Sequence, residues 1–178
     1  QENSLSDKIG RHILKWTYKK FKTYSWLDRG SDERQYNSPG IEIPVASIMR
    51  SKYGEYPEYH TSDDNLKKVV SPKGLQGGYE IIKKSITAIE NNCYPISNFL
   101  CEPMLSKRKL YPIYKQNDQN ITSDLADFKL INFLSYCDGK NSLLEIAEKC
   151  NVPIWSLYPH LEILLKNKVI SKKIITSY

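Results

Sequence analysis

Ile43-Pro44-Val45-Ala46-Ser47-Ile48-Met49 is an apolar run of strand length that lies between two polar clusters. The first cluster is Arg29-Gly30-Ser31-Asp32-Glu33-Arg34-Gln35, and the second is Tyr59-His60-Thr61-Ser62-Asp63-Asp64-Asn65. A continuous apolar run of this kind is typical of a strand buried in a mostly parallel sheet. In α/β folds the ligand-binding side chains lie in the loops at the strand ends. The sequence therefore predicts an α/β fold in which these two clusters are the candidate functional loops.

The residues around this run predict two helices and a second strand. Residues 4–20 place apolar side chains at helical spacing behind N-cap candidates, and a second helix is expected from residue 75 or 79 to residue 90. The residues expected to form the buried stripe of that second helix are Tyr79, Ile82, Ile86 and Ile89. Residues 21–26 are rich in aromatic and β-branched side chains, which predicts a strand.

Two strands do not complete a parallel sheet that is covered on both faces. We therefore expect residues 1–115 to be the C-terminal portion of an α/β sandwich whose other strands lie N-terminal to Gln1. The first residues, Gln1-Glu2-Asn3-Ser4, contain neither an initiator Met nor a signal-peptide pattern. This beginning agrees with a chain that starts inside a longer polypeptide.

The last third of the sequence predicts a winged-helix domain over residues 124–178. Residues 93–115 are expected to form an irregular connection, and the polar residues 115–123 a linker. Apolar positions from residue 125 to residue 134 recur at helical spacing and predict a first helix. Ser142 and Glu145 have the spacing of a capping box at the start of a second helix.

A third helix and a short β-ribbon complete this outline. Pro153 suits the first position of a helix, and Pro159 is expected to kink that helix or split it in two. Val169-Ile170 and Ile174-Ile175 are the candidate strands of the ribbon. A recognition helix that reads DNA needs Arg, Lys, Asn or Gln near its N-terminus, but residues 153–158 are mainly apolar and aromatic. We therefore expect this domain to contact protein rather than DNA.

Composition and charge exclude several classes of function. The chain has 178 residues and a formal net charge of +6, and its basic side chains are scattered, which indicates a solvated basic face. No apolar run approaches the ~20 residues that a membrane-spanning helix requires, so no membrane partner is expected. The four cysteines lack Cys-x-x-Cys spacing and indicate ordinary thiols in a reducing compartment, hence a cytoplasmic protein.

His60 is the residue that points most directly to chemistry. It lies among hydroxyl and carboxylate side chains in the second polar cluster. Imidazole is a good zinc ligand, and a neighbouring carboxylate can fix its tautomer. An isolated histidine is nevertheless more often a packed or surface residue than a metal ligand, so this cluster alone leaves both interpretations open.

The two clusters together resemble a known family. The segment Tyr59-His60-Thr61, followed by Asp64-Asn65, is similar to the last zinc-ligand motif of co-catalytic zinc aminopeptidases and to that of the related glutaminyl cyclases. Ser31-Asp32-Glu33 and the Gly40-Ile41 strand entry resemble the upstream motif of the same enzymes. The segments 28–36 and 54–62 look most like a bacterial branch of aminopeptidase-like zinc hydrolases that carry a C-terminal winged helix.

This resemblance implies a role for each matching position. His60 would be a zinc ligand, and Asp32 would handle protons or support the reacting centre. Glu33 stands where the family more often has His, which puts its role as a catalytic residue in doubt. The other positions that would contact substrate or support the site are Arg34, Gln35, Tyr59 and Asp64.

The resemblance also implies that this chain holds only half of the site. Such hydrolases need a His-x-Asp pair and a Glu-Glu pair, which the sequence lacks. We therefore expect this chain to be the C-terminal part of a zinc-dependent hydrolase of aminoacyl or other amide bonds, inactive without its N-terminal part. Two alternatives remain: a non-catalytic binding module built on a degenerate peptidase fold, and a complete site that performs a different acyl chemistry, such as cyclisation.

Overall fold

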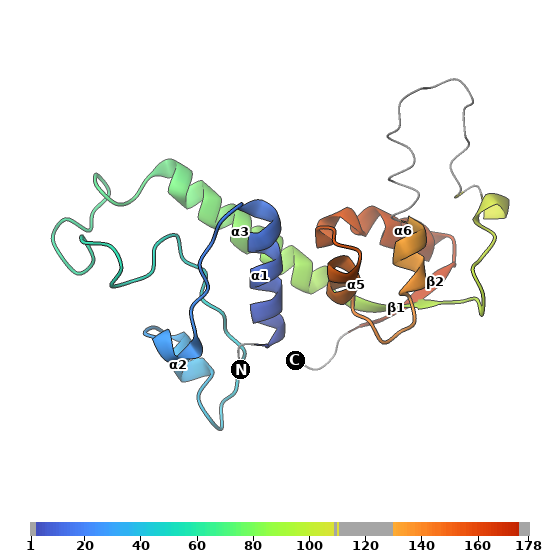
Figure 1. Ribbon diagram of the computed structural model, residues 1–178, viewed down its shortest axis with the longest axis horizontal. Helices are drawn as coiled ribbons and strands as arrows, with labels where there is room; N and C mark the ends of the chain where they lie inside the picture. Colours follow the sequence, from blue (N-terminus) through green and yellow to red (C-terminus); the bar gives the residue numbers. More distant parts are fainter. Residues whose placement is uncertain (1–2, 109, 111–129, 175–178) are drawn as a thin grey trace, which may run out of the picture. The chain divides into compact units, whose positions relative to one another are not determined.

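The structure is a computed structural model that describes residues 3–108, 110 and 130–174 (Figure 1). The chain divides into two compact units, residues 1–89 and residues 90–177, which we call unit 1 and unit 2. The first consists of helices and long irregular segments, and the second contains a two-stranded sheet together with helices. Each unit is described by itself below.

Both helices predicted for unit 1 are confirmed. The first is α1 (Leu5–Thr17), whose N-cap Ser4 forms a capping box with Asp7: the Asp7 N–H donates to Ser4 Oγ over 3.3 Å, and the Ser4 N–H donates to Asp7 Oδ2 over 3.1 Å. Its buried apolar residues are Ile9 and Ile13. The second is α3 (Pro72–Asn91), a helix of 20 residues.

The buried stripe predicted for α3 is wrong. Ile81 and Ala88 are the buried apolar residues of this helix, whereas Tyr79, Ile82 and Ile86 are 60%, 56% and 54% exposed. Ile89 is half-buried. Apolar residues at helical spacing show that a helix has an apolar face, but not which surface covers that face.

The two strands predicted for unit 1 are also wrong. Residues 21–25 and 43–49 form neither helix nor strand, and the only regular elements between α1 and α3 are η1 (Trp26–Asp28) and α2 (Glu33–Tyr36), among the described residues. A strand requires a neighbouring strand to pair its backbone groups. Here the backbone of Val45 is hydrogen-bonded by a side chain instead of a neighbouring strand, since Asn37 Nδ2 donates to the Val45 carbonyl over 2.9 Å. The described residues therefore do not form the sheet of an α/β sandwich.

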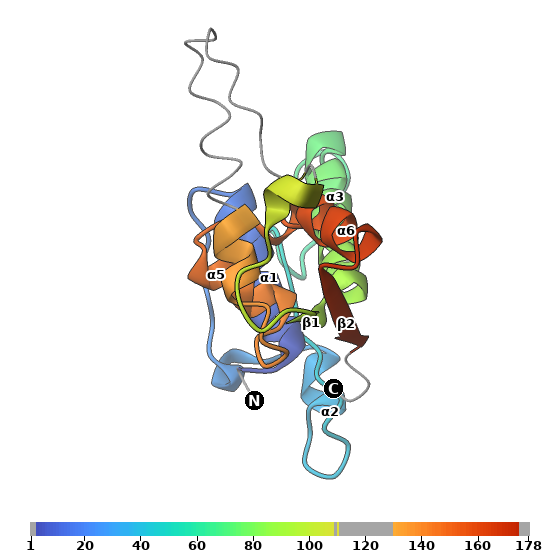
Figure 2. The same cartoon turned by 90° about the vertical axis from the view of Figure 1, so that its right-hand side faces the viewer.

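Unit 2 contains a two-stranded sheet. The strand β1 (Cys93–Ser97) pairs antiparallel with β2 (Ile170–Ile174), with Cys93 opposite Ile174 and Ser97 opposite Ile170. Figure 2 shows the two strands side by side. The ribbon predicted within residues 169–175 thus has one of its strands in the segment 93–115, which was expected to be irregular and which also contains η2 (Leu105–Arg108).

The helices of unit 2 follow the predicted winged-helix order. Residues 130–135 are helical, and they are followed by α5 (Leu143–Lys149), η3 (Ile154–Ser156) and α6 (Tyr158–Lys166). Pro153 is the N-cap of η3, and the predicted third helix is split in two, into η3 and α6, with Pro159 in the first turn of α6. The predicted linker 115–123 and the start of the helix predicted from residue 125 lie outside the described residues.

Unit 2 has a well-buried apolar core. Its fully buried side chains include Phe133, Leu143, Ile146, Ile154, Leu157 and Leu164. The predicted capping box is confirmed, because the Glu145 N–H donates to Ser142 Oγ over 3.3 Å and the Ser142 N–H donates to Glu145 Oε2 over 2.8 Å. All four cysteines are free thiols. None of the helices in the described part of the chain is long and apolar enough to cross a membrane.

Candidate functional site

Glu33, in the first polar cluster, is the polar centre of unit 1. It begins α2 and is only 7% exposed. Its Oε1 accepts hydrogen bonds from the backbone N–H groups of Gly30 over 3.0 Å and Ser31 over 3.2 Å. Oε2 accepts the hydroxyl of Ser47 over 3.1 Å, and Oε1 also accepts the hydroxyl of Tyr53 over 3.1 Å. One carboxylate thus connects the first cluster to the apolar run and to the segment that follows it.

The hydrogen bonds to Glu33 determine its charge. Burial by itself would raise the pKa of this carboxyl group, because it disfavours the charged form. The backbone N–H groups of Gly30 and Ser31 and the hydroxyl of Ser47 outweigh burial, and they lower the pKa of Glu33 to about 2. Glu33 is therefore a carboxylate at neutral pH, and its oxygens are occupied by donors from its own loop and from Ser47 and Tyr53.

Gly30 allows Tyr53 to reach this carboxylate. A Cβ atom at Gly30 would lie 2.6 Å from Cε2 of Tyr53, which is closer than real Cβ atoms approach other atoms. The Tyr53 hydroxyl also lies 3.2 Å from the carbonyl oxygen of Asp28, so both of its acceptors belong to residues 28–33. Burial, followed by the hydrogen bond to Glu33, raises the pKa of Tyr53. Tyr53 is consequently a neutral donor at physiological pH.

Two tyrosines, Tyr53 and Tyr59, connect Glu33 to His60, and a third, Tyr56, packs against Tyr59. The ring centroids of Tyr53 and Tyr59 are 6.4 Å apart, and Tyr56 packs edge-on against Tyr59 at 5.6 Å. The ring of His60 stacks on Tyr59, with the centroids 4.0 Å apart and an angle of 16° between the planes. The two polar clusters are therefore joined through Tyr53 and Tyr59, although more than twenty residues separate them in the sequence.

His60 itself is exposed and has an unusual backbone conformation. Its φ of +59° is in the left-handed region, which few residues other than glycine adopt, although histidine does so more often than most. Such conformations cluster at functional sites, where the surrounding structure maintains them. Here this conformation accompanies the stacking of the imidazole on Tyr59, and His60 as a whole is exposed.

The remaining predicted site residues lie on the surface of the same unit. Asp32 precedes α2 and caps it with no side-chain hydrogen bond, and Arg34 and Gln35 are exposed on that short helix. Asp64 accepts a hydrogen bond from the Tyr56 hydroxyl over 3.0 Å, and its N–H donates to the Thr61 carbonyl over 3.2 Å. Asp64 thus stabilises the loop that carries His60 and contacts the tyrosine cluster.

Comparison with known proteins shows which family the chain matches. Residues 1–92 match the family model described as a domain of unknown function, DUF4910. The chain belongs to the DUF4910 family. The remaining residues that match a family model, 93–172, match a winged helix-turn-helix. The whole candidate site, from Gly30 to Asp64, lies within the DUF4910 segment.

Two proteins of Clostridium acetobutylicum are similar to this DUF4910 chain. One is named "putative polysaccharide biosynthesis protein with aminopeptidase-like domain" and is 41% identical over 144 residues, which are 80% of this chain and 32% of that protein. The other is a crystal structure named "putative peptidase", with 33% identity and a TM-score of 0.80 over 97% of this chain and 37% of that one. The chain thus spans about a third of the length of these relatives, whose names are of a peptidase-like kind.

The described residues of the DUF4910 segment do not form a complete metal site. No group of three or more His, Cys, Asp or Glu side chains is positioned to hold a metal ion within residues 3–108, 110 and 130–174. A catalytic zinc ion typically takes about three protein ligands and one water. Among the predicted site residues that the structure describes, His60 has an exposed imidazole, whereas the oxygens of Glu33 already accept hydrogen bonds from four donors.

Sequence reasoning missed several residues of this site. Ser47 appeared only as part of an apolar run, and Tyr53 was not considered. One signal was present in the sequence, because Tyr53, Tyr56 and Tyr59 recur every three residues in front of His60. The contact of Tyr53 with Gly30 depends on tertiary structure and has no counterpart in sequence spacing.

Proposed function

We propose that this chain is the C-terminal part of a zinc-dependent, aminopeptidase-like hydrolase that acts on an aminoacyl or other amide bond. The observation that carries the proposal is the network from Glu33 through Tyr53 and Tyr59 to His60, which brings two distant polar loops into one site. The peptidase-like names of both relatives support the reaction class. In this proposal His60 is one ligand of a zinc ion, and the N-terminal part of the protein supplies the others.

The structure favours different roles for Asp32 and Glu33, the two acidic residues of the first cluster. Asp32 is exposed and uses its side chain in no capping hydrogen bond, so it is available to a reacting group. Glu33 is a positioning residue in this proposal, because it binds the loop that carries Asp32 and orients Tyr53. Arg34 and Gln35 are next to Asp32 and would contact the substrate. A bound zinc ion would contribute Lewis acidity and a more acidic water.

The proposed contact with the N-terminal part is supported by the apolar surface of α3. Leu75, Tyr79, Ile82 and Ile86 recur at intervals of four, three and four residues, so they share one face of this helix. Each of the four side chains is more than half exposed. A contiguous apolar surface of this kind typically marks a contact with another protein surface. We propose that the N-terminal part of the protein covers this face.

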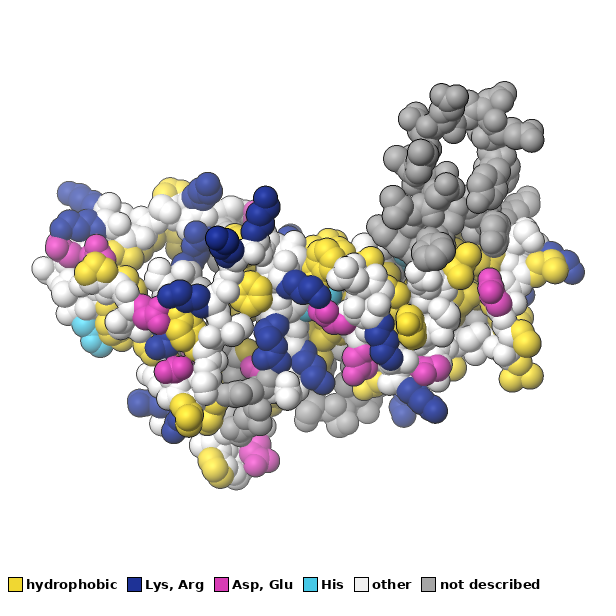
Figure 3. Space-filling view, viewed as in Figure 1, with side chains coloured by type: hydrophobic (Ala, Val, Ile, Leu, Met, Phe, Trp, Pro, Cys, Tyr) yellow, Lys and Arg dark blue, Asp and Glu magenta, His cyan; other side chains and the backbone are white. Residues whose placement is uncertain are grey.

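The winged helix is proposed to contact protein rather than DNA. The exposed side chains of α6 are Pro159, Glu162, Ile163 and Lys166, which offer one cation and no Asn, Gln or Arg. Lys and Arg side chains are scattered over the visible surface and do not gather over one element (Figure 3). DNA binding depends on many phosphate contacts from a basic face.

The proposal is tested on the complete protein that contains this chain. We expect bound zinc by elemental analysis and hydrolysis of aminoacyl p-nitroanilides that a chelator abolishes. His60→Ala should remove most of the zinc and the activity, whereas the matched change His160→Ala in the winged helix should leave both unchanged. Complete protein that binds no zinc and hydrolyses no amide substrate would contradict the proposal.

The alternative of a non-catalytic binding module is favoured by one observation. Glu33, which stands where related enzymes more often have His, is occupied by four hydrogen bonds and is not free to bind a metal. In a protein without hydrolase activity, the Glu33 carboxylate would have a structural role only: it would join the loop of residues 28–33 to Ser47 and Tyr53. Protein without zinc that still binds a ligand through this site would support the alternative.

A further inference from the structure

We propose that a cavity in unit 1, next to the cluster of Tyr53, Tyr56 and Tyr59, binds the anionic group of a small molecule. The anion is a carboxylate or a phosphate attached to an apolar body, and the statement that this molecule is the enzyme's substrate rests on the function proposed above. The cavity has a volume of about 550 Å³, and it is lined by residues of segments 14–24 and 47–56 together with one side of α3. Small-ligand sites have comparable volumes of about 300–1,000 Å³.

The cavity has an excess of positive charge. Its cationic residues are Lys20, Lys22, Arg50 and Lys52, and its carboxylate is Glu55. Oε2 of Glu55 accepts a hydrogen bond from the Tyr24 hydroxyl over 2.6 Å and forms an ion pair with Lys22 over 3.4 Å. Lys22 therefore pairs with Glu55, which also interacts electrostatically with Lys52. With four cations and one carboxylate, the lining still carries an excess of positive charge for a ligand.

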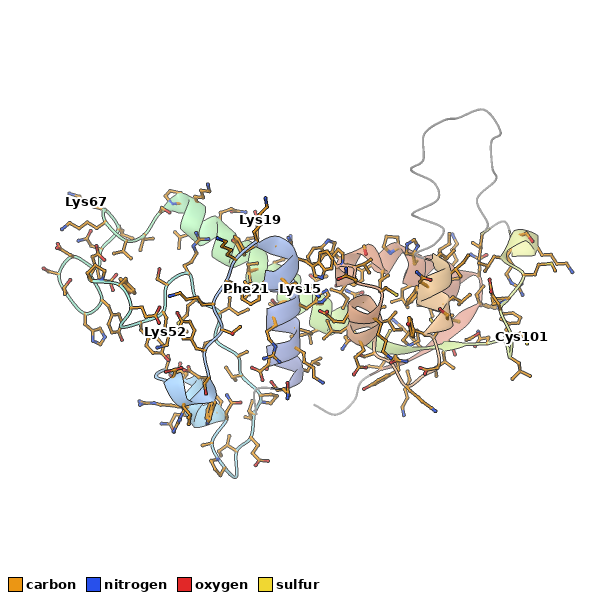
Figure 4. All side chains as sticks on the ribbon, in the orientation of Figure 1. Lys15, Lys19, Phe21, Lys52, Lys67 and Cys101 are labelled. Carbon is orange, nitrogen blue, oxygen red and sulfur yellow. The ribbon has the colours of Figure 1, made fainter. Side chains whose placement is uncertain are left out.

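The other three cations, Lys20, Arg50 and Lys52, form no ion pair with a carboxylate in the parts of the chain that the structure describes. Lys52 lies over two aromatic rings, 5.1 Å from the centroid of Tyr24 and 4.9 Å from that of Tyr53. Figure 4 labels Lys52 and Phe21, both of which line the cavity. Aromatic rings attract and position an ammonium group, so Lys52 is held at the cavity by Tyr24 and Tyr53.

Arg50 lies against a glycine of α3, Gly77. A Cβ atom at Gly77 would lie 2.8 Å from Nη1 of Arg50 and 3.0 Å from the Tyr18 hydroxyl. The absence of a side chain at Gly77 therefore lets the guanidinium lie directly on the helix, where Nη1 donates to the Tyr18 hydroxyl over 3.4 Å. A guanidinium has five N–H donors in a planar fork that matches carboxylate and phosphate oxygens.

The cavity is close to the candidate site. Tyr56 lines the cavity and packs against Tyr59, on which His60 stacks. Tyr53 contacts Lys52 on one side and Glu33 on the other. A molecule whose anionic group is bound by Arg50 and Lys52 would therefore extend along the tyrosine cluster. The apolar part of the cavity, with Ile48, Met49 and Ile81, suits the body of such a molecule.

The test is a binding measurement on the complete protein after removal of metal by a chelator, so that a metal ion cannot bind the probe. Isothermal titration calorimetry would compare 4-nitrobenzoate, 4-nitrophenyl phosphate and the neutral 4-nitrobenzamide. We expect at least one anionic probe to bind about tenfold or more tightly than the neutral one, a ratio typical of a charge-assisted hydrogen bond. The tighter of the two anionic probes identifies carboxylate or phosphate as the preferred group.

Neighbouring glycines of α3 provide a matched pair of variants. Gly77→Ala pushes the guanidinium of Arg50 away without removing charge, whereas a Cβ at Gly78 meets no atom within 4 Å. Both changes raise helix propensity, so neither is expected to weaken the helix. Both glycines line the cavity, so each change adds a methyl group to its wall, but only Gly77→Ala displaces Arg50. We expect Gly77→Ala to raise the Kd of the anionic probe severalfold and Gly78→Ala to raise it less.

A second pair of variants removes charge. Arg50→Gln should raise the Kd of the anionic probe about tenfold, whereas Lys140→Gln, an exposed lysine of unit 2, should have no effect. Equal binding of charged and neutral probes, absence of binding by any probe, or an unchanged Kd in both Gly77→Ala and Arg50→Gln would overturn the proposal. If the complete protein binds the anionic probe but neither zinc nor amide substrates, the proposed anion site is supported and the proposed hydrolase function is contradicted.

Discussion

The two units of this chain bury apolar residues to very different degrees. Unit 2 encloses fully buried side chains from β2 and from each of its helical segments in the winged helix, among them Phe133, Leu143 and Leu164. In unit 1 the buried apolar residues among those described are Ile9, Ile13, Ile81 and Ala88. Unit 1 instead exposes large apolar side chains, including Leu27, Ile43, Leu75 and Ile82.

This difference shows how each unit is stabilised. A winged helix closes a core within about 80 residues, because short helices and one ribbon cover each other's apolar faces. Unit 1 contains one long helix whose apolar face is exposed, and a polar network around Glu33 joins its loops. Polar hydrogen bonds stabilise less than apolar burial, since they replace hydrogen bonds to water. We therefore expect the stability of unit 1 to increase more than that of unit 2 when another protein surface covers its exposed apolar side chains.

The largest effect is expected in the core of unit 2. Phe133→Ala removes a completely buried ring and should lower the free energy of unfolding by about 3–5 kcal/mol. Phe99→Ala, at a side chain that is 37% exposed, should cost far less. Chemical denaturation followed by circular dichroism measures both changes. Similar losses in the two variants would contradict the well-buried core of unit 2.

Acid should weaken unit 1 through Glu33. Because its pKa is about 2 in the folded state, below the ordinary value of 4.5, the carboxylate stabilises the fold above pH 4.5. This contribution, at most about 3 kcal/mol, is lost as the pH falls from 4.5 towards 2. Glu33→Gln should lower stability at pH 7 and reduce the loss between pH 4.5 and pH 2.

Glu42→Gln is the matched control for Glu33, because Glu42 is exposed. It should leave the dependence of stability on pH unchanged. Chemical shifts of Ser31 and Tyr53, followed by NMR as the pH is lowered, would report the Glu33 site directly. An identical pH profile in wild type and Glu33→Gln would show that other carboxyl groups dominate acid unfolding.

The smallest effect within this chain is expected on the exposed face of α3. Ile82→Ser changes a side chain that is 56% exposed, so it should alter the stability of residues 1–178 by less than about 1 kcal/mol. In the complete protein the same change should cost about 1.5–3 kcal/mol if the N-terminal part covers this face. Lys83→Ser, at the next position, serves as a control in both proteins.

Unfolding measurements on the two lengths of protein decide between these outcomes. A larger cost of Ile82→Ser in the longer protein would support a covered helix face. An equal, small cost in both would show that this face remains in solvent.

Sequence reasoning was reliable where the determinants are local. The helices α1, α3 and α5 were predicted because capping residues and apolar spacing act within a few residues of each other. Ser4 with Asp7 and Ser142 with Glu145 form their capping boxes in the structure. The winged-helix outline followed from the same signals, although β1 was missed because Pro95 and its neighbours resemble a loop.

The candidate site was only partly accessible to sequence reasoning. The two polar clusters were recognised, and Glu33 and His60 are connected through the tyrosines that separate them in the chain. The predicted strands at residues 21–26 and 43–49 were wrong here, because a strand exists only when another strand accepts its hydrogen bonds. The residues of a segment such as Ile43–Met49 show that it could form a strand, but they do not show which other strand would pair with it.

The sequence alone determined α1, α3 and α5, the caps of α1 and α5, and the winged-helix order, because short-range hydrogen bonds and periodic apolar positions specify them. Only the tertiary structure decided that Glu33 is a buried anchor, that Tyr53 lies against Gly30, and that Arg50 rests on Gly77. These contacts join residues 20–27 positions apart, and the path of the chain between such residues depends on packing rather than on any local pattern.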